Sequence, residues 1–316
     1  MTWYFPFIFL GIGVLFGLIK LPGRTFVIVE QIGNVALIVL MLTIGISVGS
    51  DKVVIASIGT IGYQCVLIAM SAIFFSVLFV FLLEKTILPL DSLKEKLSDK
   101  QLHPDTEVEI DQESKSSPLV WIIPVSIILG AIAGLLFMPQ NMLLLNDKIF
   151  LVSLAILYVT VGISLSQNLG VFRYVKSLGF KILLIPFAIL MGSIVGGGLA
   201  GLVLNIEPHV SVMSASGMSY YSLTGAMMKQ YYGILDGTYG FLVNVFREFL
   251  TVLMLPLLIK LGKGAPIAGG AAGCMDTMLV PISKFVGIEL GFVALITGTI
   301  LTFAVPILLP VLSQIL

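Results

Sequence analysis

The sequence predicts an all-α integral membrane protein with about eight transmembrane helices, and three observations carry this prediction. Of its 316 residues, 58% are hydrophobic and only 11% are charged, whereas soluble domains carry roughly 25% charged residues. The apolar residues form long stretches, which are typical of membrane-spanning helices. The formal net charge is zero, so nothing indicates a nucleic-acid partner.

Eight stretches have the length and composition of spans: 3–19, 26–47, 53–83, 119–138, 149–167, 178–204, 240–260 and 288–313. The third is longer than a straight helix needs to cross about 30 Å of hydrocarbon. We therefore expect it to be tilted, or broken near Gly59 and Gly62. Two further segments, 209–232 and 264–284, are apolar but rich in Gly, Ser and Pro. We expect these to be broken or re-entrant, because irregular backbone at membrane depth is tolerated where it is buried in protein or lines water.

Basic residues gather in alternate loops and thereby predict the orientation. The rich loops hold Lys20 and Arg24, then Lys85, Lys94, Lys96, Lys100 and Lys115, then Arg173, Lys176 and Lys181, then Lys260 and Lys263. The other loops hold only Lys52 and Lys148. By the positive-inside rule the rich loops are cytoplasmic. Both termini would then face outward from the cytoplasmic (inner) membrane.

The two predicted triplets of spans resemble each other at an offset of 117 residues. At this offset Gly17-Leu18 falls on Gly134-Leu135, Pro22 on Pro139, and Thr43-Ile44-Gly45-Ile46-Ser47 on Thr160-Val161-Gly162-Ile163-Ser164. A unit with an odd number of spans must reverse direction in its second copy, so the sequence predicts inverted three-span repeats, a recurrent design of transporters. Chance matching among Gly, Leu and Ile is the alternative. Segments 209–232 and 264–284 form a second, looser pair.

The repeat divides the chain into four parts. Residues 1–83 form the first repeat, 84–117 a charged cytoplasmic linker, 118–204 the second repeat, and 205–316 the broken segments and last two spans with the candidate site. The linker carries nine acids against five lysines and reads as a solvated connection. A regulatory or cation-gathering role is its alternative.

Two acidic residues, Glu248 and Asp276, lie inside apolar stretches. An acid at bilayer depth costs about 2.5–3.5 kcal/mol on insertion scales, so it is rare there unless it faces a partner or a wet cavity. We interpret the two as carboxylates that bind a cation, exchange protons, or do both. The structural alternatives are a buried ion pair with Arg247 for Glu248, and a helix N-cap for Asp276.

Further candidate ligands surround these acids. The segment Ser214–Gly225 is dense in hydroxyls and glycines, which can hydrogen-bond a polar ligand or simply let helices pack closely. Asn244, four residues before Glu248, shares its helix face and is a candidate co-ligand. The predicted substrate- and proton-binding set is Glu248, Asp276, Asn244, Arg247, Ser219, Tyr220, Tyr221, Ser222, Thr224, Gly273 and Thr277.

Other chemistries lack their signatures. His103 lies in the charged linker and His209 stands alone, so no metal-ligand spacing is seen. There is no P-loop for ATP-driven transport. We expect no catalytic residue, cofactor or metal site.

Several motifs together resemble the bacterial lysine exporter family (LysO type). They are Ser216-Gly217, Tyr221-Ser222-Leu223-Thr224-Gly225, Arg247-Glu248 and Cys274-Met275-Asp276-Thr277 with Pro281. The similarity covers nearly the whole chain, and the 28-residue spacing of the two acids is part of it. The resemblance implies an inner-membrane exporter of L-lysine and lysine analogues, with eight spans and essential acids at Glu248 and Asp276. The acidic linker 84–117 departs from the family pattern.

We therefore expect a secondary transporter that exports L-lysine by proton antiport. Its partners would be L-lysine, protons and the lipid bilayer, and a homodimer is left open. The carboxylates would bind the ammonium groups, while groups near 216–225 or a helix start at Asp276 hold the substrate carboxylate. A monovalent-cation/proton antiporter using the same acids is the nearest rival. An intramembrane aspartyl protease is disfavoured, because one acid is glutamate and no Gly-x-Gly-Asp sequence is present.

Overall fold

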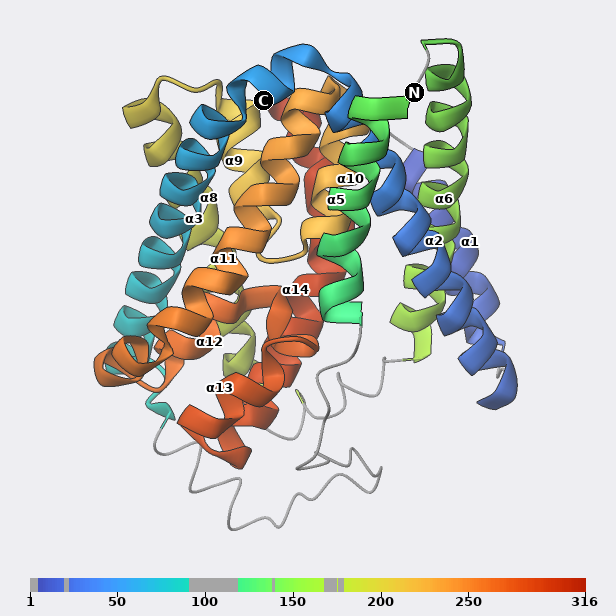
Figure 1. The fold of residues 1–316 in the computed structure, drawn as a ribbon. Coiled ribbons are helices and arrows are strands. Elements are labelled where there is room, and N and C mark those ends of the chain that lie inside the picture. The colour runs from blue at the N-terminus through green and yellow to red at the C-terminus, as the bar shows by residue number, and fades with distance from the viewer. Residues whose placement is uncertain (1–4, 20–22, 91–118, 138–139, 168–174, 176–178) are drawn as a thin grey trace.

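The computed structural model describes residues 5–19, 23–90, 119–137, 140–167, 175 and 179–316. All regular structure within these ranges is helical, which confirms the predicted class (Figure 1). The long helices are α2 (Gly23–Ser50), α3 (Lys52–Thr86), α6 (Gln140–Gln167), α8 (Leu184–Leu204), α11 (Ile234–Leu261) and α14 (Ile288–Ile315). The shorter elements are α1 (Phe5–Leu18), α5 (Leu119–Phe137), η2 (Phe180–Leu183), α9 (Pro208–Ser216), α10 (Tyr221–Tyr232), α12 (Gly264–Gly270), η3 (Ala271–Met275) and α13 (Leu279–Val286).

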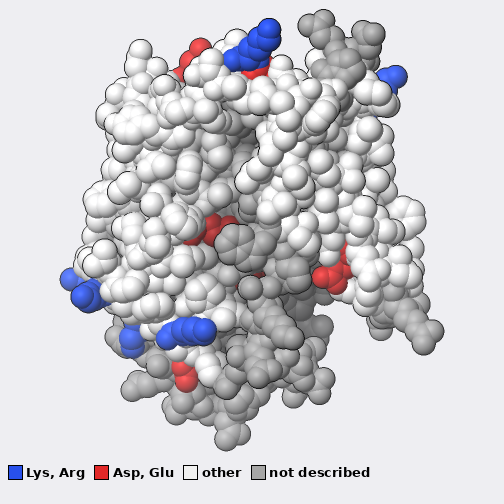
Figure 2. Space-filling model, viewed as in Figure 1, with Lys and Arg blue, Asp and Glu red and all other residues white. Residues whose placement is uncertain are grey.

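Six helical stretches in the described ranges are long and apolar enough to cross a membrane, and α1 and part of α5 are shorter apolar helices. Large apolar side chains cover the outside, and Leu202 and Val203 are 77% and 84% exposed. Figure 2 shows a broad uncharged band between charged ends, with acidic atoms at mid-height. Such a surface is unfavourable in water and favourable in lipid, so the chain is a multi-pass membrane protein.

Helices α1, α2, α5 and α6 pack together through glycine contacts. A Cβ atom added at Gly13 of α1 would lie 2.2 Å from the carbonyl oxygen of Val159 on α6. A Cβ added at Gly45 of α2 would lie 2.3 Å from the carbonyl oxygen of Ile127 on α5. The paired helices therefore touch backbone to backbone, as small residues allow in membranes.

Helix α3 runs unbroken through Gly59 and Gly62, so the break expected there is wrong. In Figure 1 its first part crosses one end of the molecule before the helix descends beside α8, which absorbs the excess length. The Ser71 hydroxyl donates to the Gly196 carbonyl of α8 over 2.8 Å. The linker predicted at 84–117 lies largely outside the described residues. Its first residues continue α3, and Glu84 accepts the backbone N–H of Gly264 at the start of α12 over 3.1 Å.

Both Gly/Ser-rich segments are interrupted helices, as predicted. The first consists of α9 and α10 and lies in the upper half of Figure 1, whereas α12 and α13 of the second lie in the lower half. The interruptions meet, because the Ala272 N–H donates to the Met218 carbonyl over 2.9 Å. Met218, Ser219 and Ala271 have φ angles of 50°, 77° and 49°, which non-glycine residues rarely adopt. Such strained backbone persists only where its surroundings hold it, often at functional sites.

Candidate functional site

Glu248 and Asp276 come together where the two interrupted segments meet. Glu248 lies on α11 and Asp276 follows η3. The Thr277 hydroxyl donates to Glu248 Oε1, and it also lies 3.2 Å from Asp276 Oδ1. A hydroxyl has one proton, so it can donate to only one of the two carboxylates at a time. The three side chains thus form one proton-sharing unit.

The two acids differ in their exposure to solvent. Asp276 is exposed and Glu248 is half-buried, although both belong to an apolar part of the chain. The backbone N–H of Thr277 also donates to Asp276 Oδ1. The N-cap alternative for Asp276 is not observed, because α13 begins at Leu279 with Met278 as its cap residue. The helix start expected at Asp276 is therefore wrong by three residues.

Asn244 supports the tip between α9 and α10 in this conformation. Its side-chain oxygen accepts the Ser219 N–H over 2.7 Å. Its amide nitrogen donates to the carbonyls of Ser214 and Gly240 over 2.9 and 2.8 Å. Gly217 leaves room for this arrangement, since a Cβ there would lie 2.5 Å from the Asn244 amide nitrogen. Asn244 is fully buried and holds the strained tip in place.

The hydroxyl groups at this tip fall into two classes. The Ser216 and Ser219 hydroxyls are buried and have no hydrogen-bond partner among the described residues. A buried hydroxyl without a partner is costly, so these two are candidates to hydrogen-bond a ligand or a water molecule. The Thr224 hydroxyl donates to the Tyr220 carbonyl over 2.8 Å and is already satisfied.

The remaining predicted residues lie around the same point. Tyr220 lies in the interruption between α9 and α10, where its N–H donates to the Gly217 carbonyl over 2.8 Å, and Tyr221 begins α10. Ser222 is buried in the first turn of α10. The Gly273 carbonyl accepts the backbone N–H groups of Asp276 and Met278 over 3.2 and 2.9 Å, which shapes the turn after η3.

Arg247 points away from this cluster. Its guanidinium donates to the Ser193 and Ser76 hydroxyls over 2.8 and 3.1 Å. It also donates to the carbonyls of Gly269 and Ala268 over 3.2 and 3.1 Å. In the described part of the chain these are its polar partners, so the ion-pair alternative for Glu248 is not observed.

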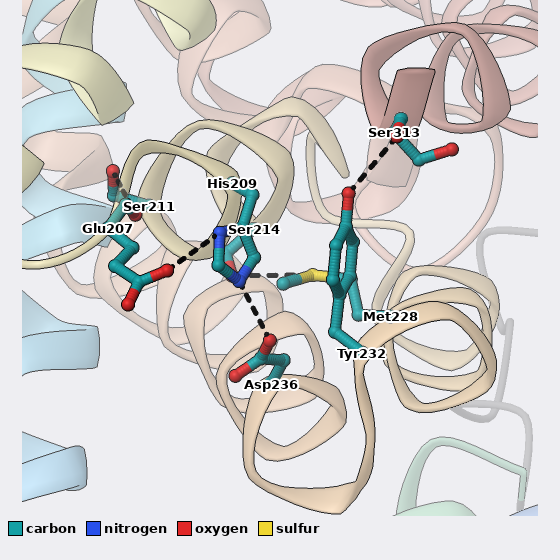
Figure 3. A network of polar contacts seen from close by, with 8 residues as sticks. All are labelled: Glu207, His209, Ser211, Ser214, Met228, Tyr232, Asp236 and Ser313. Carbon is teal, nitrogen blue, oxygen red and sulfur yellow. Dashed lines mark hydrogen bonds and ion pairs between the residues drawn. The ribbon is translucent and has the colours of Figure 1, made fainter. Parts of the chain in front are cut away.

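A polar cluster at the upper end of the molecule was not predicted, because His209 seemed isolated in sequence. Figure 3 shows the His209 ring between two carboxylates, at 3.3 Å from Glu207 and 3.1 Å from Asp236. The ring stacks on Tyr232, whose hydroxyl donates to the Ser313 carbonyl over 3.3 Å. The cluster links α9, α10, α11 and α14 across long sequence separations, which periodicity cannot reveal. Among the described residues no group of His, Cys, Asp and Glu is arranged to hold a metal ion.

The arrangement around Thr277 can exchange protons and bind a cation. Carboxylates that lose their protons gain charge-assisted contacts to an ammonium group. The nearby unsatisfied hydroxyls can serve another polar part of the same ligand.

The chain is similar to known proteins of one family. The model of the family described as lysine exporter LysO matches residues 7–97 and 125–313. An Escherichia coli (strain K12) protein named lysine exporter LysO is 26% identical over 161 residues, which are 51% of this chain and 54% of that protein. A Haemophilus influenzae protein named "Putative lysine exporter" is 26% identical over 154 residues, which are 49% of this chain and 78% of that protein.

The matched region thus spans about half the length of the Escherichia coli relative. No solved structure matches the chain. The family match covers both parts of the chain that flank the acidic linker, and it includes every predicted site residue. The chain belongs to the lysine exporter LysO family.

Proposed function

We propose that this protein exports L-lysine and lysine analogues from the cytoplasm in exchange for protons. The observation that carries the proposal is the shared Thr277 hydroxyl between Glu248 and Asp276, at the meeting point of two interrupted helices. The names of the two relatives supply the substrate class.

Proton exchange follows from the competition for these carboxylates. When the site faces the cytoplasm, Glu248 and Asp276 release protons and accept the ammonium groups of lysine. When it faces outward, protons return to the carboxylates and lysine leaves. Two acids that share one hydroxyl proton suit this cycle, because neutralising one changes the hydrogen bonding of the other.

The carboxylate of lysine needs donors, and the tip between α9 and α10 offers them. The Ser216 and Ser219 hydroxyls are unpartnered among the described residues. Helix α10 begins at Tyr221 without a side-chain cap, so its first N–H groups can donate hydrogen bonds to an anion. We propose the start of α10, not a helix start at Asp276, as the place for the substrate carboxylate, because α13 begins only at Leu279.

We also propose eight spans built from inverted repeats, with residues 1–83 and 118–204 as the two copies and 205–316 carrying the site. The glycine contacts support the repeat. Gly13 and Gly45 of the first copy correspond to Gly130 and Gly162 of the second, and the Gly13–Gly162 contact is mirrored by the Gly45–Gly130 contact. Figure 1 places the start of α1 and the end of α14 at one end of the molecule, and the end of α3 and the start of α5 at the other. We propose that this second end is cytoplasmic and that both termini are external. A single cysteine at position 100, which lies outside the described residues, should resist an impermeant thiol reagent applied to intact cells.

The decisive experiment is uptake of labelled L-lysine into inverted membrane vesicles. In such vesicles the cytoplasmic face is outside, so export appears as uptake. An acidic interior should drive lysine in, and a protonophore should stop it. Vesicles without the protein are the control. Sodium uptake in place of lysine uptake would favour the cation/proton antiporter, and absence of lysine uptake would refute the proposal.

A further inference from the structure

A second polar site lies apart from the Thr277 cluster, near the end of the molecule that we propose to be external. A cavity of about 500 Å³ opens between α2, α6, α10 and the start of α11. This volume is within the range of small-molecule sites. Two carboxylates, Asp51 and Asp147, line it together with Lys229 and the hydroxyl groups of Ser47 and Ser50.

The Lys229 ammonium sits in a cage at one side of this cavity. Its Nζ donates to the Ser47 hydroxyl over 2.6 Å, lies 4.2 Å from the centre of the Phe150 ring, and is 3.7 Å from Asp147 Oδ1. The side chain of Lys229 is only 8% exposed. An acceptor hydroxyl, an aromatic face and a carboxylate are the groups that recognise an alkylammonium ion.

The Ser47 hydroxyl is fixed as an acceptor toward the cage. Its own proton goes to the Thr43 carbonyl over 3.0 Å, and it accepts the Asn146 side-chain N–H over 3.0 Å. One lone pair therefore remains for a cationic donor. This preorganisation belongs to α2 and α6 and does not depend on Lys229.

The balance of charges lining the cavity favours binding of a cation. Asp51 caps α3 through one oxygen, which accepts the N–H groups of Val53 and Val54 over 2.8 and 3.2 Å. Asp147 is 60% exposed, and its 3.7 Å separation from Lys229 exceeds a hydrogen bond. Two carboxylates face one ammonium group among the lining residues, so the cavity suits a further positive charge.

We propose that this cavity is an exit site for a primary alkylammonium ligand, whose ammonium group takes the cage that Lys229 occupies here. The inference rests on the proposed lysine export, because the side chain of lysine presents such a group. Lys229 is then a tethered competitor: on returning to the cage it displaces the ligand toward the surface, where Asp147 is exposed.

Chemical rescue tests the cage without relying on transport. Lys229→Ala removes three methylene groups and the ammonium, so n-propylammonium is the matching probe. We expect it to raise the Tm of the purified full-length variant saturably, by about 2–4 °C at ten times its Kd. Wild-type protein should show a much smaller shift, because Lys229 competes for the cage. 1-Propanol, and n-propylammonium with Lys229→Ala/Asp147→Asn, should give no shift.

A second variant tests the cage if Lys229→Ala fails to fold. Lys229→Met keeps an unbranched stem as far as the position of Cε, with its Cβ beside Gly237, and the ammonium ion is its matching probe. Absence of a shift in a folded variant would overturn the cage, as would equal shifts in the variant and wild type.

A binding measurement then separates this site from the Thr277 cluster. With Glu248→Gln and Asp276→Asn both present, adding Lys229→Ala should give binding of one L-lysine per chain. The parent double variant should bind it much more weakly, because Lys229 competes for the cage. A ratio of zero in the triple variant would refute the exit site. Vesicles that fail to transport lysine, with the rescue intact, would instead refute the proposed function and leave the ammonium site standing.

Discussion

Thr277→Val is the sharpest single test of the proton-sharing unit. Valine has nearly the shape of threonine but lacks the hydroxyl that joins Glu248 and Asp276. Thr277 is half-buried and precedes α13, so the change leaves helix packing largely intact. It removes one hydrogen bond to a carboxylate and a proton path between the two acids.

The size of the effect follows from the energy of that bond. A hydrogen bond to a charged group contributes about 1.5–3 kcal/mol, and each 1.36 kcal/mol is a factor of ten. Lysine uptake into inverted vesicles under an imposed pH gradient should therefore fall roughly 10- to 100-fold in kcat/KM. Protein amount and Tm should change little, because the lost bond lies in a solvent-accessible cluster.

Thr277→Ser is the matched control, since it keeps the hydroxyl and loses only a methyl group. It should retain most of the uptake. Wild-type uptake by Thr277→Val would refute the role of the shared hydroxyl. An equal loss in both variants would show that the methyl contact, not the proton, matters.

Four further variants and one control test the rest of the site. Glu248→Gln and Asp276→Asn should each nearly abolish lysine uptake with no loss of Tm, because each removes a proton carrier together with a charge that is costly at membrane depth. Well-folded variants with wild-type uptake would refute the mechanism. Gly217→Ala should lower Tm and uptake, since its Cβ would lie 2.5 Å from the Asn244 amide, whereas Gly198→Ala should do neither, because its nearest contact is at 3.8 Å. Arg247→Met should lower Tm strongly by leaving buried carbonyls unpaired at about 1–3 kcal/mol each, and an unchanged Tm would contradict the hydrogen-bond network.

The sequence predicts the class of this fold for a physical reason. Long apolar stretches can adopt few structures in a bilayer, because the backbone polar groups must be satisfied internally. The density of Gly and Ser in 209–232 and 264–284 weakens helices there. Both segments are interrupted in the structure. The course of α3 was less predictable, because isolated glycines at positions 59 and 62 permit a break without requiring one.

The site could be predicted only in part. The rarity of acids in apolar sequence singles out Glu248 and Asp276, which the structure joins through Thr277. Asn244 supports the α9–α10 tip, whereas other residues there have unpartnered hydroxyls. The sequence cannot show this difference, because it depends on hydrogen-bond partners up to 30 positions away. In the cage around Lys229, the ammonium group contacts Ser47, which lies 182 positions away in the sequence. No local sequence pattern can indicate such a contact.

The neighbouring residues Arg247 and Glu248 show how one helix serves two purposes. Successive residues on a helix point about 100° apart, so a buried arginine need not neutralise the acid beside it. Arg247 donates hydrogen bonds to Ser76 of α3, Ser193 of α8 and two carbonyls of α12. The hydroxyls of these two serines lie 3.2 Å from each other. The guanidinium therefore fastens α11 to α3, α8 and α12. Because the hydrogen bonds of Arg247 are satisfied there, in the described part of the chain it does not pair with the Glu248 carboxylate on the adjacent face.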